Sequence, residues 1–290
     1  MDNTVEIVCH AFLNKCPPNQ KEALLSYLPP EEALKVKSLG ASLGKPEKGF
    51  ELPDELLAHV HFSWLAPILR ALSETEIRLF LSTLNETQIK GLKQQLLFSN
   101  QLPTLSPFAL TYLKTTLFEE IAPPDLIPPT CLPANKLNAL LEFKPPQLQL
   151  LIDLLSMHDL AVEIRHIIDT VKLKKIYSLI SSSQQSYLKT LSHKKEPVSF
   201  KKIGLNHWNG DTEALQSILN QRGINRLAKA LYGSHPSLIW YITHRLDIEK
   251  GQLMQRLCTP LDHPRAATIL ADQIIRLSES FKPSNPAQNT

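Results

Sequence analysis

Glycine is scarce in this sequence, which contains 9 glycines and 22 prolines among 290 residues. β-Sandwiches and nucleotide-binding α/β folds need glycine at tight turns and phosphate-binding loops, so the composition disfavours both. Alternating runs of Val, Ile and Thr, which would predict strands, are also lacking. The high proline content instead favours helices that begin at proline and are joined by short turns.

Cysteine pairs and long apolar runs are lacking too. The four cysteines show no CxxC spacing, so neither a zinc ribbon nor a disulfide framework is indicated. No stretch approaches about 18 consecutive apolar residues, and the N-terminal residues show no signal-peptide cleavage pattern. We therefore expect a cytoplasmic protein that is at most peripheral to a membrane.

Sequence motifs of enzymatic chemistry are absent. There is no GxSxG elbow, no local Cys and His signature, and no Gly-rich phosphate turn after a strand. Residues 40–45 resemble a phosphate-binding loop only superficially, because one residue is missing and Pro46 replaces the hydroxyl that holds magnesium. His59 and His61 diverge by about 200° on a helix and would not share a metal there. We expect no catalytic residue, no cofactor and no metal site.

A pattern of short, capped helices is clearest in residues 63–97. Ser73 with Glu76, and Asn85 with Gln88, are typical of capping boxes, and each pair precedes apolar residues at three-and-four spacing. Helices of two or three turns are marginal alone in water, so their apolar faces must pack against neighbouring helices. The stretch predicts a stack of short helices.

Similar units recur at residues 24–39, 176–191 and 215–231, with a weaker copy at 151–164. Each has apolar residues, a turn residue and a second apolar run, and in the 215–231 unit helical pieces flank Gly223. This recurrence predicts an all-α fold of short-helix repeats, with armadillo-like superhelical lobes and a C-terminal helical lobe.

Proline-rich and lysine-rich segments divide the chain. Five prolines in residues 122–133 disfavour regular helix, and residues 193–203 are rich in lysine. Both segments are expected to act as hinges between helical lobes. The expected parts are an N-terminal helical segment 1–50, a repeat lobe 51–121, a second lobe 134–192, a C-terminal lobe 204–282 and a disordered tail 283–290.

The distribution of charge suggests where a partner could bind. The net charge of +3 is too small by itself to indicate nucleic-acid binding, but residues 171–202 contain eight lysines and one acid, Glu196. A solvated surface is the plain interpretation, and docking to an acidic partner or to membrane headgroups is the functional one. The candidate partner-binding residues are Phe62, Trp64, Lys194, Lys195, Lys201 and Lys202.

Isolated tryptophan and histidine residues have plain structural interpretations. Trp240 lies in an apolar run and is expected in the core, whereas Trp64 and Trp208 lie at element starts. Core or edge packing is the first expectation for these two, and an exposed indole at a binding hot spot is the alternative. His158 and His166 could share a helix face, but no third ligand accompanies them, so we expect ordinary boundary positions.

Two stretches resemble known families. The run LAPILRALSETEIRLFLSTLNETQIKGLKQQL resembles the middle-domain repeat of flagellar motor switch proteins of the FliG type, and GINRLAKALYGSHPSLIWYITHRLD is similar to that family's C-terminal pattern. The family's Glu-His-Pro-Gln type motif is replaced here by His-Phe-Ser-Trp at residues 61–64, and its charged torque helix is not matched. The HFSWL run is also similar to a stretch of SctK-type accessory proteins of the injectisome sorting platform.

These resemblances imply a non-enzymatic helical scaffold or adaptor in a bacterial type III secretion or flagellar-type apparatus. Its partners would be other proteins of that machine rather than nucleic acid, bound by burying partner helices in grooves. Two alternatives stay open. One is a regulatory helical domain resembling magnesium-transporter N-domains, which predicts acidic clusters, and the other is a nucleic-acid-binding module that uses the lysine-rich segment.

Overall fold

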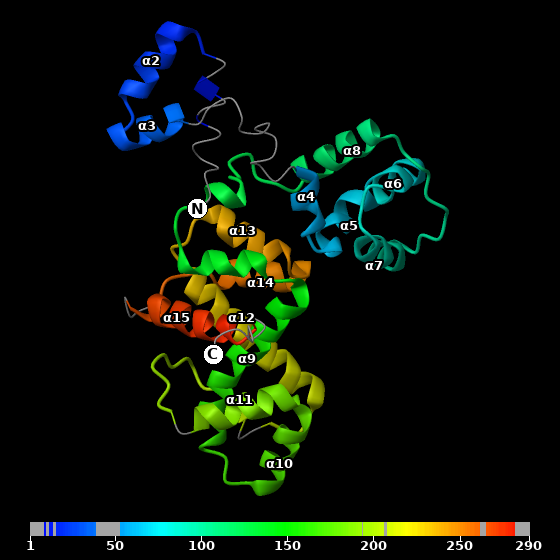
Figure 1. The fold of residues 1–290 in the computed structure, drawn as a ribbon. Coiled ribbons are helices and arrows are strands. Elements are labelled where there is room, and N and C mark those ends of the chain that lie inside the picture. Colours follow the sequence, from blue (N-terminus) through cyan, green and yellow to red (C-terminus); the bar gives the residue numbers. More distant parts are fainter. Residues whose placement is uncertain are drawn as a thin grey trace, which may run out of the picture. The chain divides into compact units, whose positions relative to one another are not determined.

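The chain is all-helical and forms two compact units. The computed structural model describes residues 9, 12–13, 16–38, 53–192, 194–205, 208–261 and 265–281, and these contain helices and no strand (Figure 1). The units are Met1–Pro133 and Ala134–Thr290, so the division falls at the end of the proline-rich segment 122–133. The all-α prediction is confirmed.

The first unit is built from short helices. α5 packs against α6 and α7, and α8 packs against α4 and α6, while α2 and α3 enclose a small cluster of Leu13, Leu25 and Val36. Its elements are α2 (Pro18–Ser26), α3 (Pro30–Ser38), α4 (Pro53–Ala58), α5 (Phe62–Arg70), α6 (Glu74–Leu81), α7 (Glu86–Leu96), α8 (Pro107–Glu119) and the 3-10 turn η2 (Pro129–Cys131).

Both capping boxes expected in this unit are present. The Ser73 hydroxyl accepts from the Glu76 amide at 3.4 Å, and the Glu76 carboxylate accepts from the Ser73 amide at 2.8 Å. The Asn85 and Gln88 pair does the same, and the Gln88 side-chain amide also donates to the carbonyls of Leu57 and Val60. The second box therefore both starts α7 and joins it to the end of α4, which confirms the prediction of short helices in series.

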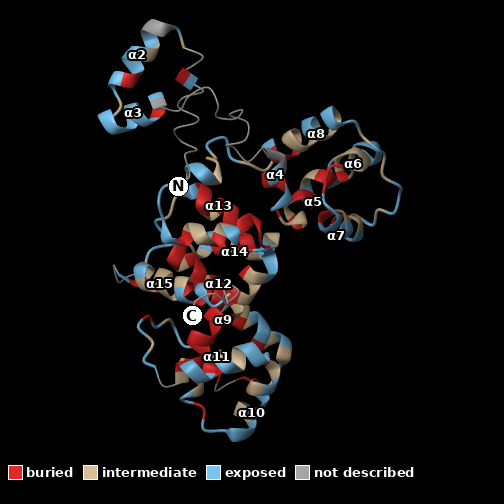
Figure 2. Ribbon diagram, in the orientation of Figure 1, coloured by how far each residue is buried: buried red, intermediate tan, exposed pale blue. Residues whose placement is uncertain are grey.

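The second unit surrounds one long buried helix, α9. Figure 2 shows buried residues concentrated on α9, α12 and α13, and α9 packs against α11, α12 and α15. Trp208 and Trp240 are both buried in this unit. Its elements are η3 (Lys136–Glu142), α9 (Pro145–Ile164), α10 (Thr170–Leu179), α11 (Ser182–Ser192), α12 (Thr212–Leu231), α13 (Pro236–His244), α14 (Ile248–Leu257) and α15 (Ala266–Glu279).

Two of the expected helix-turn-helix units are in fact single helices. Residues 151–164 lie within α9, and residues 215–231 lie within α12. Each of these two helices has 20 residues. Gly223 is not at a turn but at the crossing of these helices, where an added Cβ would lie 2.0 Å from the Ile152 carbonyl oxygen. The glycine allows the two helix backbones to approach closely. The predictions of turns in these two units are wrong.

Residues 194–203 pack on the second unit and are not the expected hinge. Val198 is buried, its carbonyl accepts from Arg226 at 3.2 Å, and Glu196 is bonded to three side chains. The two lobes expected at 134–192 and 204–282 accordingly form one unit. No helix of the described ranges has both the length and the apolar character needed to cross a bilayer. The expectations for residues 40–45, and for the tail 283–290, lie outside the described residues.

Candidate partner-binding groove

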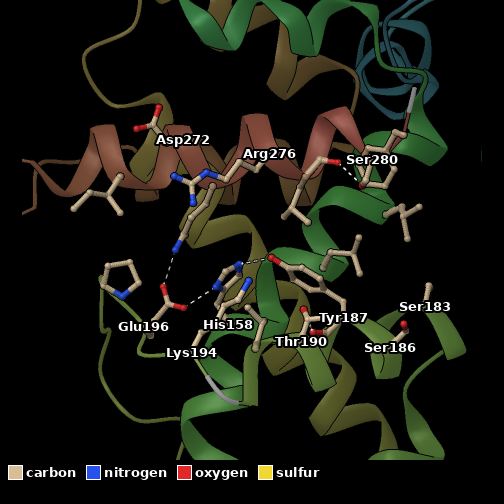
Figure 3. Close-up of a pocket in the computed structure, with 18 of the residues that line it drawn as sticks. His158, Ser183, Ser186, Tyr187, Thr190, Lys194, Glu196, Asp272, Arg276 and Ser280 are labelled. Atoms are coloured by element: carbon tan, nitrogen blue, oxygen red, sulfur yellow. Dashed lines mark hydrogen bonds and ion pairs between the residues drawn. The ribbon is translucent and has the colours of Figure 1, made fainter. Parts of the chain in front are cut away.

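A cavity of about 850 Å³ opens in the second unit between α9, α11, residues 194–197 and α15 (Figure 3). Cavities of this size are typical of binding sites, and this one is large enough to hold several side chains of a bound molecule. Apolar side chains from three helices, and one from the turn that follows α15, contribute to its lining: Leu150, Leu154, Leu191, Ile269, Leu277 and Phe281. We call this cavity the groove.

One face of α11 supplies hydroxyl groups to the groove. Ser183, Ser186, Tyr187 and Thr190 all line it, as residues three and four positions apart on a helix must when they share a face. The helix begins at a capping pair, in which the Ser181 amide donates to the Gln184 side chain and the Gln184 amide donates to the Ser181 hydroxyl. The cap fixes the residue at which α11 begins.

A buried histidine connects this wall to the segment that follows α11. The two ring nitrogens of His158 lie 2.9 Å from the Tyr187 hydroxyl and 2.6 Å from a Glu196 carboxylate oxygen. A carboxylate can only accept, so Nδ1 of His158 donates to Glu196, and in the neutral ring Nε2 accepts from Tyr187. His158 is buried rather than at a boundary, so the expectation of an ordinary boundary position is wrong for this residue.

Arg226 of α12 completes the network. It is fully buried, and its guanidinium nitrogens lie 2.6 Å from Asp159 and 3.0 Å from Glu196. The Gln273 amide of α15 donates to the same Glu196 carboxylate at 2.9 Å. Burying a charge is costly unless it is paired and hydrogen-bonded, and here the pairing joins α9, α12, α15 and the 194–203 segment.

The network does not favour proton transfer. Burial acts to raise the pKa of Glu196, but the hydrogen bond from His158 and the charge of Arg226 outweigh it and lower the pKa to about 2. Burial and the charge of Glu196 raise the pKa of Tyr187 to about 12. Near neutral pH Glu196 therefore stays ionised and Tyr187 stays protonated, so neither is suited as a general base or nucleophile. The arrangement fixes the groove wall.

The rim of the groove is cationic. Its two carboxylates are already paired, Glu196 with Arg226 and Asp272 with Lys136 at 3.0 Å. Lys194, Lys195 and Arg276 also line the groove, are exposed, and make no ion pair within the described part of the chain. The accessible charge around the opening is therefore positive.

The candidate residues named from the sequence are only partly brought together. Lys194 and Lys195 line the groove, whereas Lys201 and Lys202 line a separate cavity of about 20 Å³ together with Asp159 and Glu163. The same segment thus carries one lysine pair at the groove and another pair away from it.

Phe62 and Trp64 belong to the first unit and are half-buried in α5. A Cβ added at Gly91 would lie 2.6 Å from the Phe62 ring, so this ring packs directly on α7. The preceding His61 caps α5 by accepting from the Ser63 amide at 3.3 Å. These contacts give Phe62 a packing role in its own unit.

Sequence reasoning missed the residues that form the network. A local signal existed, because His158 and Asp159 lie between the apolar residues Met157 and Leu160, and buried polar groups need partners. The partner Arg226 lies 67 positions away from Asp159, and no local spacing predicts that pairing.

Comparisons with known protein families, curated proteins and solved structures find no match. Among the residues the structure describes, no group of three or more His, Cys, Asp or Glu side chains is placed to hold a metal ion. The chemical role of the groove therefore has to be inferred from its own shape, charge and hydrogen bonds.

Proposed function

We propose that this protein is a non-enzymatic helical scaffold or adaptor that binds an acidic, amphipathic segment of a partner protein in the groove. The observation that carries the proposal is the combination of an apolar lining with an unpaired cationic rim around a cavity of about 850 Å³. Apolar side chains of the partner would be buried in the groove, and its carboxylates would lie near Lys194, Lys195 and Arg276.

The cations contribute more to selection than to affinity. An exposed ion pair contributes roughly 0.2 to 1 kcal/mol, so three of them alone would give weak binding. Charge complementarity instead speeds association and disfavours a basic partner, while burial of apolar surface supplies most of the binding free energy. An acidic segment without apolar residues should therefore bind poorly.

Binding fits this site better than catalysis does. Tyr187, His158 and Glu196 have the connectivity of a hydrolase triad, but the pKa of the Tyr187 hydroxyl is raised to about 12, which makes it a poor nucleophile near neutral pH. A triad needs a nucleophile that can be deprotonated and a base that can take its proton. Here the same hydrogen bonds connect α9 to α11 and to the 194–197 segment, and so fix their positions relative to one another.

The cellular setting we propose is the one that the sequence resemblances imply. The chain would be a cytoplasmic component of a bacterial type III secretion or flagellar-type apparatus, held at the inner membrane through its partners. The resemblance of residues 61–97 to FliG-type and SctK-type proteins supports this setting. Affinity capture from the native host, followed by mass spectrometry, should recover proteins of such an apparatus, and their absence would contradict the setting.

Titration of labelled peptides tests the groove itself. We expect a peptide with Glu residues on one helix face and Leu on the other to bind, and the same peptide with Lys in place of Glu not to bind. Lys194→Glu with Lys195→Glu should weaken binding by about tenfold or more, whereas Lys201→Glu with Lys202→Glu should change it by less than about twofold.

The second lysine pair is a matched control, because it carries the same charge on the same segment but does not line the groove. Equal losses from both pairs would show general charge attraction and would refute the groove as the site. Displacement of the peptide by duplex DNA, with loss of DNA binding in the Lys201 and Lys202 variant, would favour the nucleic-acid alternative.

A further inference from the structure

Two aliphatic side chains protrude where α9 is followed by α10. Ile168 is 95% exposed and Val171 is 75% exposed, and α10 lies at this end of the second unit (Figure 2). A single exposed aliphatic residue needs no explanation, but here two lie three positions apart in the sequence. A side chain that is 95% exposed stands clear of its neighbours, so it cannot lie at the bottom of a groove.

Lysines lie beside these side chains on the outer face of α10. The inner face buries Ile176 in the hydrophobic core, with Leu173 and Tyr177 packed partly against it. At 100° per residue the opposite face carries Val171, Lys174 and Lys175, and the structure has all three exposed. The outer face therefore combines an aliphatic residue with the Lys174 cation, while the Lys175 ammonium lies over the Trp208 ring, 5.7 Å from its centroid.

The nearby carboxylates are used inside the fold. Asp169 caps α10 by accepting from the Val171 and Lys172 amides, at 2.8 and 3.2 Å. Glu163 accepts from the amides of Gly204 and Leu205, at 3.0 and 3.1 Å. Their negative charge is held by backbone donors rather than by the lysine side chains.

A second group of lysines belongs to the same end of the unit. The Lys172 ammonium reaches the Leu205 carbonyl at 3.5 Å, which places Leu205 beside the start of α10, and Lys201 and Lys202 line a small cavity with Glu163 near the end of α9. Lys201 and Lys202 at the beginning of that segment are exposed. We call Ile168, Val171, Lys174, Lys201 and Lys202 the tip surface.

We propose that the tip surface docks directly on a membrane that contains anionic lipids. A bilayer interface offers a continuous apolar phase to isolated aliphatic side chains, while lysine stems keep their ammonium groups at the level of the headgroups. A protein partner would have to supply a pocket for each protruding side chain. This contact is separate from the groove, and it differs from attachment to the membrane through partners.

The binding should be weak, reversible and dependent on salt. Two aliphatic residues insert little area, and the cations act only within a Debye length of the surface, about 8 Å at physiological ionic strength. Sedimentation of the full chain with vesicles tests this. We expect it to bind phosphatidylcholine vesicles containing about one third phosphatidylglycerol, and to bind pure phosphatidylcholine vesicles far less.

Ile168→Ser with Val171→Ser should lower the partition coefficient on the anionic vesicles by about tenfold. Leu97→Ser is the matched control, because Leu97 is an aliphatic residue of the first unit that is 92% exposed, and this variant should bind as the unchanged chain does. Lys201→Gln with Lys202→Gln should also weaken binding and make it less sensitive to salt.

The proposal would be overturned by no binding to anionic vesicles, by equal binding to neutral ones, or by full binding of the Ile168 and Val171 variant. The last would mean that the lysines adsorb without insertion. Circular dichroism should give all variants the same melting midpoint, because the altered side chains are exposed, and equal loss by Leu97→Ser would likewise refute the tip surface.

Discussion

Replacing Glu196 by Gln tests whether the buried network holds the groove wall. The substitution keeps the shape of the side chain but removes the charge that faces His158 and Arg226. The pKa of Glu196 falls from its ordinary value of 4.5 to about 2 in the folded chain. Because each factor of ten in proton affinity corresponds to about 1.4 kcal/mol, the ionised form stabilises the fold by about 3 kcal/mol at neutral pH.

The dependence on pH follows from the sign of this change. A carboxyl group whose pKa is lowered by folding contributes its full stabilisation above its unfolded pKa, and the contribution is lost as the pH falls toward the folded pKa. For Glu196 the loss should therefore begin near pH 4.5 and continue toward pH 2. At pH 7 the free energy of unfolding of the Gln variant should be about 3 kcal/mol lower than that of the unchanged chain. It should also decrease less when the pH is lowered, because Gln carries no charge to lose.

Urea denaturation followed by tryptophan fluorescence measures this difference, because Trp208 and Trp240 are both buried in the second unit. Glu142→Gln is the control, since Glu142 is exposed in the same unit. It should change the free energy of unfolding by less than about 0.5 kcal/mol. Parallel acid curves for the unchanged chain and the Glu196 variant would refute the reasoning.

Three further substitutions follow from the same structure, each checked by denaturation of the full chain. Arg226→Met should cost about 3 to 5 kcal/mol, because it leaves two buried carboxylates without their cation, and a cost below about 1 kcal/mol would contradict the pairing. Gly223→Ala should cost about 1 to 3 kcal/mol or more, because its Cβ would collide with the Ile152 carbonyl, and a neutral result would mean that the two helices are not in close contact. Asn85→Ala should cost about 1 kcal/mol by removing the acceptor for the Gln88 amide, and an unchanged midpoint would count against the cap.

Local features of the fold could be predicted from the sequence. Ser73 with Glu76 and Asn85 with Gln88 form capping boxes because the groups that satisfy one another lie three residues apart. The start of α9 at Pro145 is also a local feature, because the fixed φ of proline suits the first turn of a helix. Such signals need no knowledge of the rest of the chain.

Features that depend on distant residues could not be predicted in this way. The sequence predicts two helical pieces on either side of Gly223, yet the close crossing with Ile152 requires the glycine inside a single helix. The 193–203 segment suggested a hinge by its lysines, but the paired Glu196 holds its middle against three helices. Of the residues expected from the sequence to bind a partner, only Lys194 and Lys195 line the groove, and the buried network beside it was not expected.

Hydrogen–deuterium exchange with and without the acidic amphipathic peptide tests the central claim most directly. The account predicts slower exchange in α11, residues 194–197 and α15 when the peptide is bound, and no change in α5 to α7 of the first unit. Protection confined to the first unit, or to the segment around Lys201 and Lys202, would contradict the groove as the binding site.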